Sequence, residues 1–103
     1  LNGQSFAFVG YLPSTPVERG PRIRELEALA RKTGQTQIFI ETPYRNTALL
    51  QALLQTLPPD TRLATASGLS LDSATCHSDL VKNWKHKPWA VENTQPTVFA
   101  IGR

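Results

Sequence analysis

The residues best suited to chemistry in this sequence stand at positions 41–45, where Glu, Thr, Pro, Tyr and Arg follow one another. The apolar run 38–40 precedes them and a leucine-rich stretch follows, which predicts a strand, a tight corner and a helix. Such a corner offers backbone N–H groups and the positive end of a helix dipole to a ligand. An acid there is costly for mere packing, so ligand contact and an internal ion pair between Glu41 and Arg45 are equally good interpretations.

Two further groups of residues have reactive or binding side chains. Cys76 and His77 are adjacent, but neighbours on a strand point to opposite faces, so we favour a structural role for both. A basic and aromatic cluster near the carboxyl end could bind RNA by charge and stacking. Because the net charge is only +3, we favour a solvated rim with the tryptophans in the core or in an interface. This cluster comprises Lys82, Trp84, Lys85, His86, Lys87 and Trp89.

The composition predicts one domain over residues 1–103, of which 40% are hydrophobic. A single cysteine excludes an internal disulfide and favours a reducing, cytoplasmic setting. No apolar run approaches the roughly 20 residues that span a bilayer, so we expect no membrane segment. No spacing fits a metal site or a phosphate-binding glycine loop, so we expect no metal and assign no catalytic residue. The chain starts at Leu1 and lacks Met, which we interpret as the sign of a piece of a longer protein.

The elements that must position these residues can be read from apolar periodicity. In the first half we expect a strand at 6–9 stopped by Gly10, a loop at 14–21, and a helix ended by Gly34. After the strand 38–40, a second helix begins with Thr42 as N-cap and Pro43 in its first turn, or slightly later with Asn46 as the cap. The apolar face of the first helix comprises Ile23, Leu26, Leu29 and Ala30, and that of the second Leu49, Leu50, Leu53, Leu54 and Leu57.

The second half predicts three more strands and one short helix. The strands are expected at 62–66, 73–77 and 96–101, and the helix at 79–85 with Ser78 as its cap. The resulting order, β-α-β-α-β-β-α-β, predicts an α/β fold in which a mixed parallel and antiparallel sheet of about five strands is flanked by helices.

Two of these segments together resemble a known family. The run 8–13, Phe-Val-Gly-Tyr-Leu-Pro, and the run 38–45, Ile-Phe-Ile-Glu-Thr-Pro-Tyr-Arg, are similar to the carboxyl-terminal half of the tetrapyrrole methylase superfamily of S-adenosylmethionine-dependent methyltransferases. Within it, the sequence most resembles the branch of the 16S ribosomal RNA ribose 2′-O-methyltransferase, whose corner reads Tyr-Glu-Ser-Pro-His-Arg. The resemblance covers nearly the whole chain.

The resemblance implies a role for this domain and its partners. S-adenosylmethionine would lie in a cleft between this carboxyl-terminal domain and an amino-terminal domain with a glycine-rich loop, which this chain lacks. The missing amino-terminal domain would therefore be a partner, a homodimer is implied, and the methyl acceptor could be ribosomal RNA. The fragment alone would be inactive.

The resemblance also assigns site residues by position. The corner at Glu41 and Thr42, the turn at Ser67 and Gly68, and the start of the last strand at Pro96 and Thr97 would face the cofactor. The entrance of the cleft would be lined by Tyr11, Pro13 and Arg45.

One departure concerns the methyl acceptor, and one alternative concerns the class of protein. The segment 72–75, Asp-Ser-Ala-Thr, replaces an acidic, His-containing stretch associated with the ribosomal RNA enzyme, which leaves a tetrapyrrole or another acceptor open. The alternative function is a non-enzymatic α/β module that binds RNA or a protein through the loop from Trp84 to Trp89.

Overall fold

The chain forms one mixed sheet with helices on one side. The computed structural model describes residues 6–13, 15–41, 45–67, 75–86 and 97–102, without the side chains of 16, 75 and 76. Along the chain the elements are β1 (Phe6–Tyr11), α1 (Pro16–Thr33), β2 (Thr36–Glu41), α2 (Asn46–Thr56), β3 (Arg62–Ser67), β4 (Thr75–Leu80), α3 (Val81–His86) and β5 (Thr97–Gly102). This order confirms the predicted α/β class.

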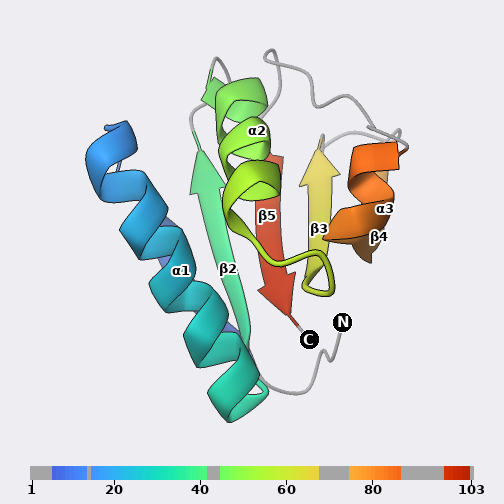
Figure 1. Cartoon of the computed structure of the whole chain (residues 1–103). Helices are drawn as coiled ribbons and strands as arrows, with labels where there is room; N and C mark the ends of the chain where they lie inside the picture. Colours follow the sequence, from blue (N-terminus) through green and yellow to red (C-terminus); the bar gives the residue numbers. More distant parts are fainter. Residues whose placement is uncertain (1–5, 14, 42–44, 68–74, 87–96, 103) are drawn as a thin grey trace.

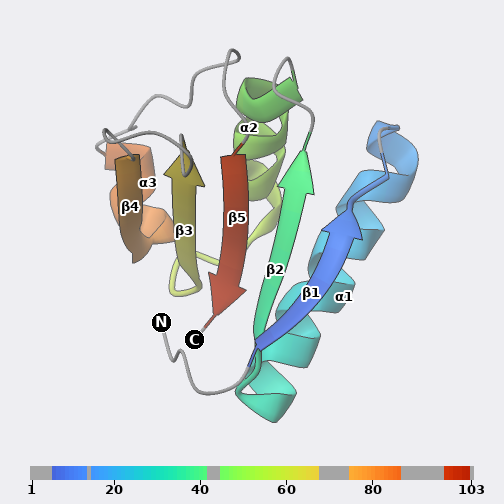
Figure 2. The ribbon, with the colours of Figure 1, turned by 180° about the vertical axis from the view of Figure 1, so that it is seen from behind.

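The strands of the sheet follow the order β1-β2-β5-β3-β4. β1 pairs with β2 in parallel, whereas β5 is antiparallel to both of its neighbours, β2 and β3, and β4 is antiparallel to β3. The last strand of the chain is therefore inserted into the centre of the sheet. All three described helices lie on the same face, as the two opposite views show (Figures 1 and 2).

The core lies between this face of the sheet and the helices. The rings of Phe39 and Phe99, paired across β2 and β5, stack with their centroids 5.8 Å apart. Trp84 of α3 is fully buried, and its indole N–H donates a 2.9 Å hydrogen bond to the carbonyl oxygen of Leu63. The predicted leucine face of α2 is confirmed, because Leu49, Leu50, Leu53 and Leu57 are buried and Leu54 packs against them.

The first helix is longer than its sequence pattern predicts. α1 begins at Pro16, so the prediction of a loop was wrong for residues 16–21. A proline fits the first turn of a helix, and the missing hydrogen bond of Pro21 is tolerated in a helix whose Ile23 and Leu26 are fully buried. Leu29 was wrongly assigned to the apolar face, since it is 40% exposed. The predicted end is confirmed, with Gly34 left-handed at φ 72°.

Several element boundaries also differ from the prediction: β2 is longer than 38–40, α2 begins at Asn46 and not at Pro43, and at two boundaries strand pairing continues past the predicted end. Gly10 does not stop β1; it adopts φ +81° inside the strand, beside a shift in the register with β2. β4 extends to Leu80, so Ser78 lies in the strand and does not cap α3. The carboxylate of Asp79 instead accepts 2.7 Å hydrogen bonds from the Leu80 N–H and from the Asn83 side chain.

A candidate ligand-binding site at the strand ends

The carboxyl ends of three strands meet at one edge of the sheet. β1 and β2 are parallel, and β3 runs the same way because both β2 and β3 are antiparallel to β5. The same edge therefore holds the first residue of β5 and the start of α2, which follows β2 through a short connection (Figure 1). In α/β folds this is the edge at which ligands bind.

Three polar residues form a row across this edge. Thr97, the first residue of β5, pairs with Glu41 of β2 on one side and with Ser67 of β3 on the other. Directly opposite residues point to the same face of an antiparallel pair, so all three side chains lie on the face that carries the helices. Glu41 is 4% exposed and Thr97 is 1% exposed.

A fourth residue joins this row from the helix. Asn46, fully buried at the start of α2, donates a 3.0 Å hydrogen bond from Nδ2 to Oγ1 of Thr97. The Thr97 hydroxyl also lies 2.8 Å from Oγ of Ser67, and either hydroxyl can be the donor. We call Glu41, Asn46, Ser67 and Thr97 the strand-end cluster. It forms a polar layer that adjoins the hydrophobic core at the carboxyl ends of β2 and β3.

The side chains of the strand-end cluster are suited to binding a polar ligand. It combines an amide, two hydroxyls and a carboxyl group, which together can donate to and accept from a polar ligand. The first turn of α2 adds backbone N–H groups and a positive dipole end beside it. Among the residues that the structure describes, no three His, Cys, Asp or Glu side chains gather as metal ligands.

The structure brings together three of the six residues predicted to face a cofactor. Glu41, Ser67 and Thr97 meet in the strand-end cluster, although 56 positions separate the first from the last. The other three, Thr42, Gly68 and Pro96, are direct chain neighbours of this cluster but lie outside the described residues. Their predicted role stays a prediction.

The three residues predicted at the cleft entrance lie in different places. Tyr11 is 63% exposed and pairs with Ile40, which puts its side chain on the face of the sheet opposite to the strand-end cluster. The carbonyl of Pro13 accepts a 3.4 Å hydrogen bond from the buried Arg19, which ties this turn to α1. Arg45 is half-buried at the N-cap position of α2, close to the cluster in the chain.

Sequence reasoning missed the role of Asn46. The sequence suggested this residue only as a helix cap, whereas the structure makes it the first residue of α2, with Arg45 as the N-cap. A signal was present: Asn46 precedes Leu49, Leu50 and Leu53 by three, four and seven positions, so it continues their buried stripe. A polar residue at a core position of a helix indicates a specific partner.

The described members of the basic and aromatic cluster near the carboxyl end differ in exposure. Trp84 is fully buried and meets the ring of His77 edge-on, so it cannot stack on a nucleobase. This corrects the part of the RNA-binding alternative that used Trp84. Lys82, Lys85 and His86 are exposed, while Lys87 and Trp89 lie outside the described residues.

Comparisons with known proteins identify the fold. No protein-family model and no curated protein matches the chain. Among solved structures, the methyltransferase CobJ is similar over 98% of this chain and 42% of its own length, with a TM-score of 0.55 and 16% identity. The uroporphyrin-III C-methyltransferase of Thermus thermophilus, complexed with S-adenosylhomocysteine, is similar over 100% of this chain and 44% of its own, with a TM-score of 0.58 and 14% identity.

These likenesses show the fold, and they agree with the fold predicted from the sequence. The chain has an arrangement found within two methyltransferases and spans less than half the length of each. Within the described residues, no helix is long and apolar enough to cross a membrane.

Proposed function

We propose that this chain is the carboxyl-terminal half of an S-adenosylmethionine-dependent methyltransferase of the tetrapyrrole methylase superfamily. The observation that carries the proposal is the strand-end cluster, in which Glu41, Ser67 and Thr97 share one register row at the carboxyl edge of the sheet. The sequence resemblance assigns cofactor contact to these three positions independently of the structure. Both structural neighbours are methyltransferases, and one holds S-adenosylhomocysteine.

The residues of this edge fit one wall of a cofactor site. Bound S-adenosylmethionine supplies an electrophilic methyl group on its sulfonium. The chain's contribution is to bind and orient: the Asn46 amide fixes the Thr97 hydroxyl, which in turn aligns the hydroxyl of Ser67. Pre-ordered hydroxyls lose little entropy when they meet a polar ligand, and exclusion of water by the buried layer strengthens each hydrogen bond.

The complete enzyme needs groups from outside this chain. We propose an amino-terminal half with a glycine-rich loop as the facing wall of the cleft. Positioning and desolvation of the acceptor would then provide most of the rate, without a covalent enzyme intermediate or a metal.

The acceptor is the finer part of the proposal. The corner at 41–45 favours the ribosomal RNA ribose methyltransferase branch, because its Glu, Pro and Arg match that branch at the same spacing. The name of the Thermus thermophilus neighbour supports a tetrapyrrole instead. Methyl transfer from labelled S-adenosylmethionine to 30S ribosomal subunits and, separately, to uroporphyrinogen distinguishes the two.

Calorimetric titration of the full-length protein with S-adenosylhomocysteine tests the cofactor proposal. We expect Ser67→Ala and Thr97→Val each to weaken binding by about ten-fold, the equivalent of about 1.4 kcal/mol per lost hydrogen bond. Thr42→Trp and Gly68→Trp, at the adjoining predicted positions, should block binding by their bulk.

The matched control is Thr33→Val. Thr33 is an exposed threonine at the end of α1, and its hydroxyl donates a 2.6 Å hydrogen bond to the carbonyl of Leu29. Its replacement should leave the affinity for S-adenosylhomocysteine unchanged. If Ser67→Ala and Thr97→Val also leave it unchanged in folded protein, the cofactor assignment of the strand-end cluster is wrong.

A further inference from the structure

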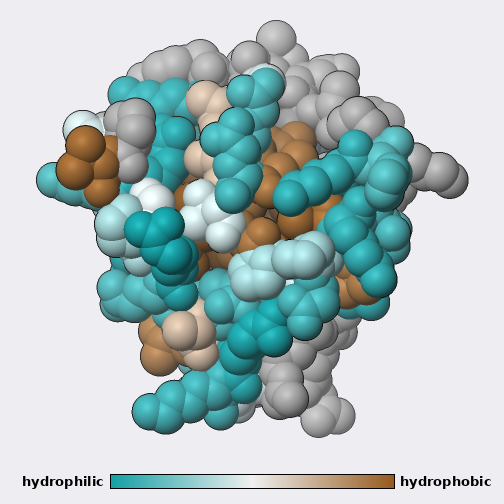
Figure 3. Space-filling model, in the orientation of Figure 1, coloured by the Kyte–Doolittle hydropathy of each residue, from teal (hydrophilic) through white to brown (hydrophobic). Residues whose placement is uncertain are grey.

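One face of the sheet carries none of the described helices, and we call it the open face. It is turned to the viewer in Figure 2. The helix-covered side differs in character, because hydrophilic side chains occupy most of its surface (Figure 3). On β5, β3 and β4, strand alternation directs a mostly apolar set of side chains to the open face: Val98 and Ala100, then Arg62, Ala64 and Ala66, then Ser78 and Leu80.

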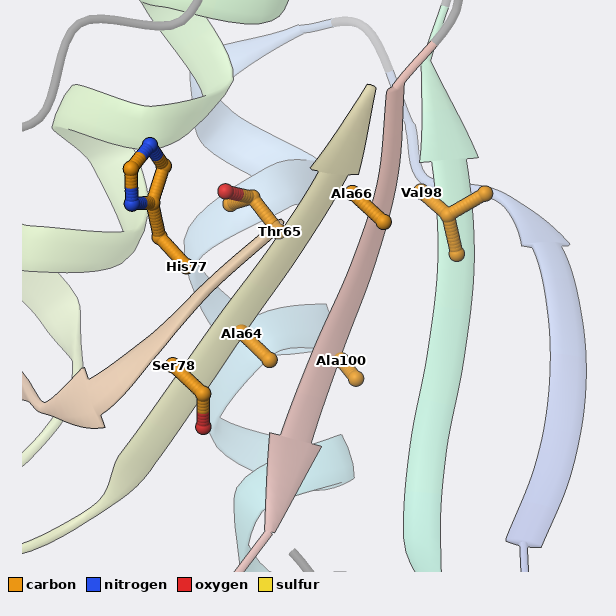
Figure 4. A pocket seen from close by; sticks show the side chains of 7 residues that line it. All are labelled: Ala64, Thr65, Ala66, His77, Ser78, Val98 and Ala100. Carbon is orange, nitrogen blue, oxygen red and sulfur yellow. The ribbon is translucent and has the colours of Figure 1, made fainter. Parts of the chain in front are cut away.

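A groove lies on this part of the open face. It has a volume of about 240 Å³ and runs over β5, β3 and β4. Small side chains make its floor, with Ala64, Ala66 and Ala100 flanked by Val98 and Ser78, all directed to the open side (Figure 4). The side chains of Thr65 and His77 point to the opposite side of the sheet (Figure 4). The surface that a ligand would meet is therefore mostly apolar.

The floor of the groove is flat. Ala64 and Ala100 are direct partners across β3 and β5, so their methyl groups lie about 5 Å apart. Ala66 follows two positions along β3, about 7 Å from Ala64. Three methyl groups at this spacing support a planar ring system on its flat side. The volume is below the about 300–1,000 Å³ of pockets for drug-sized ligands, so the groove suits one or two fused rings.

A single cation lies at one end of this floor. Arg62 precedes Ala64 by two positions on β3, about 7 Å along the strand, and it is half-buried. Its partners in the register row are Gly102 and Leu80, neither of which is charged. Among the residues that the structure describes, none forms an ion pair with Arg62. A half-buried guanidinium beside an apolar floor favours a ligand that brings its own carboxylate.

We propose that the groove binds a planar aromatic carboxylate of one or two rings. The rings lie on the three alanine methyl groups of the floor, and the carboxylate accepts hydrogen bonds from the Arg62 guanidinium, whose planar shape allows two parallel bonds. The exposed hydroxyl of Ser78 can donate to a polar substituent at the side of the ring. This site lies on the face of the sheet opposite to the strand-end cluster, so the two sites bind their ligands separately.

Charge and shape favour such a molecule over a nucleic acid or an acyl chain. Among the described residues of the open face, Arg62 alone is charged, whereas binding to a phosphate backbone needs several cations. An acyl chain must give up the freedom of many bonds to lie extended on an open floor, which lowers its affinity. A rigid ring loses no such freedom and covers all three methyl groups at once.

A titration of the full-length protein with 2-naphthoate, followed by NMR of its alanine methyl groups, tests this site. We expect saturable shifts at the methyl groups of Ala64, Ala66 and Ala100, with a dissociation constant below about 1 mM, an ordinary affinity for a ligand of this size. The neutral analogue 2-naphthylmethanol should bind at least about five-fold more weakly, because it lacks the charge-assisted hydrogen bonds to Arg62.

Two variants act on different parts of the site. Arg62→Gln should weaken the binding of 2-naphthoate by at least about five-fold and leave that of 2-naphthylmethanol within about two-fold. Ala64→Leu should weaken both by at least about ten-fold, because its side chain fills the space above the floor. Arg24→Gln is the matched control: Arg24 is an exposed arginine of α1, and its change should leave both affinities unaltered. Circular dichroism checks that each variant is folded.

Several outcomes would overturn the inference. One is a lack of saturation at about 5 mM, and another is equal affinity of wild type and Arg62→Gln for 2-naphthoate. Shifts confined to other alanines, or tighter binding of decanoate than of 2-naphthoate, would also contradict it. So would binding that weakens as the protein concentration rises, because a second copy would then cover the groove. A protein that binds 2-naphthoate but no S-adenosylhomocysteine would instead refute the proposed function alone.

Discussion

The amide of Asn46 holds the hydroxyl of Thr97 at 3.0 Å, although 51 positions separate the two residues. This contact fastens the start of α2 to the start of β5, and the 2.8 Å contact from Thr97 to Ser67 extends it to the end of β3. A helix and two strands are thus joined through one threonine. The stability of this edge therefore depends on that hydroxyl, and in the proposed function so does the binding of the cofactor.

Thr97→Val should destabilise the fold by about 1–3 kcal/mol, because it removes the acceptor of a buried amide while keeping the shape of the side chain. Ser67→Ala, at a half-buried site, should cost about 0.5–1.5 kcal/mol. Urea unfolding of both single variants and the double variant measures their coupling. Strictly additive effects would contradict a hydrogen bond between the two hydroxyls.

Two glycines should respond to alanine in opposite directions. Gly10 adopts φ +81°, so Gly10→Ala should lose about 1–2 kcal/mol from backbone strain, even though no atom lies within 4 Å of the added Cβ. Gly20 lies inside α1, and its added Cβ would meet only the Arg24 guanidinium at 3.8 Å, so Gly20→Ala should gain up to about 1 kcal/mol. Thermal unfolding of the two variants measures the changes. Equal shifts in melting temperature would contradict a left-handed conformation at Gly10.

Trp84→Phe should destabilise the protein by at least about 1–3 kcal/mol. The change removes the indole N–H that donates to the carbonyl of Leu63 at 2.9 Å, and it leaves that buried oxygen without this donor. Denaturant unfolding followed by far-UV circular dichroism measures the loss. The neighbouring exposed residue gives the control, since Lys85→Ala should change stability by less than about 0.5 kcal/mol. A loss of similar size in both variants would count against a core role for the indole.

The contact between Arg31 and Asp60 should make stability depend on acid pH. A 2.6 Å hydrogen bond from the Arg31 guanidinium lowers the pKa of the Asp60 carboxyl below its ordinary value. The stabilisation is complete above the unfolded pKa of about 3.9 and is lost as pH falls through the lower folded pKa. The melting temperature of Asp60→Asn should therefore approach that of wild type below about pH 4.

The control for this pH effect removes the Arg31 guanidinium, which donates the hydrogen bond to Asp60. In an Arg31→Met background, Asp60→Asn should shift the melting temperature by the same small amount at every pH. Arg31 also contacts Glu27 within α1 and Thr61 at 3.3 Å, so the background variant itself will be less stable. If the difference in melting temperature between wild type and Asp60→Asn stays constant down to about pH 2.5, Arg31 does not perturb the pKa of Asp60.

Local sequence determined the kinds of element and their order, because apolar spacing depends only on residues a few positions apart. The stripe from Leu49 to Leu57 was sufficient to specify the buried face of α2. Gly34 specified the end of α1, since glycine adopts the left-handed conformation without strain. The corner at 41–45 also marked one of the four residues of the strand-end cluster, Glu41.

Only the tertiary structure decided which strand ends meet. The insertion of β5 between β2 and β3 puts Thr97 between Glu41 and Ser67, and no short-range pattern carries that pairing. The same holds for Tyr11, whose side chain lies on the face of the sheet without described helices because of the bulge between Phe8 and Gly10. Sequence periodicity assigns a residue to a face of its own element, whereas strand order and register, set by packing across the whole sheet, decide its neighbours.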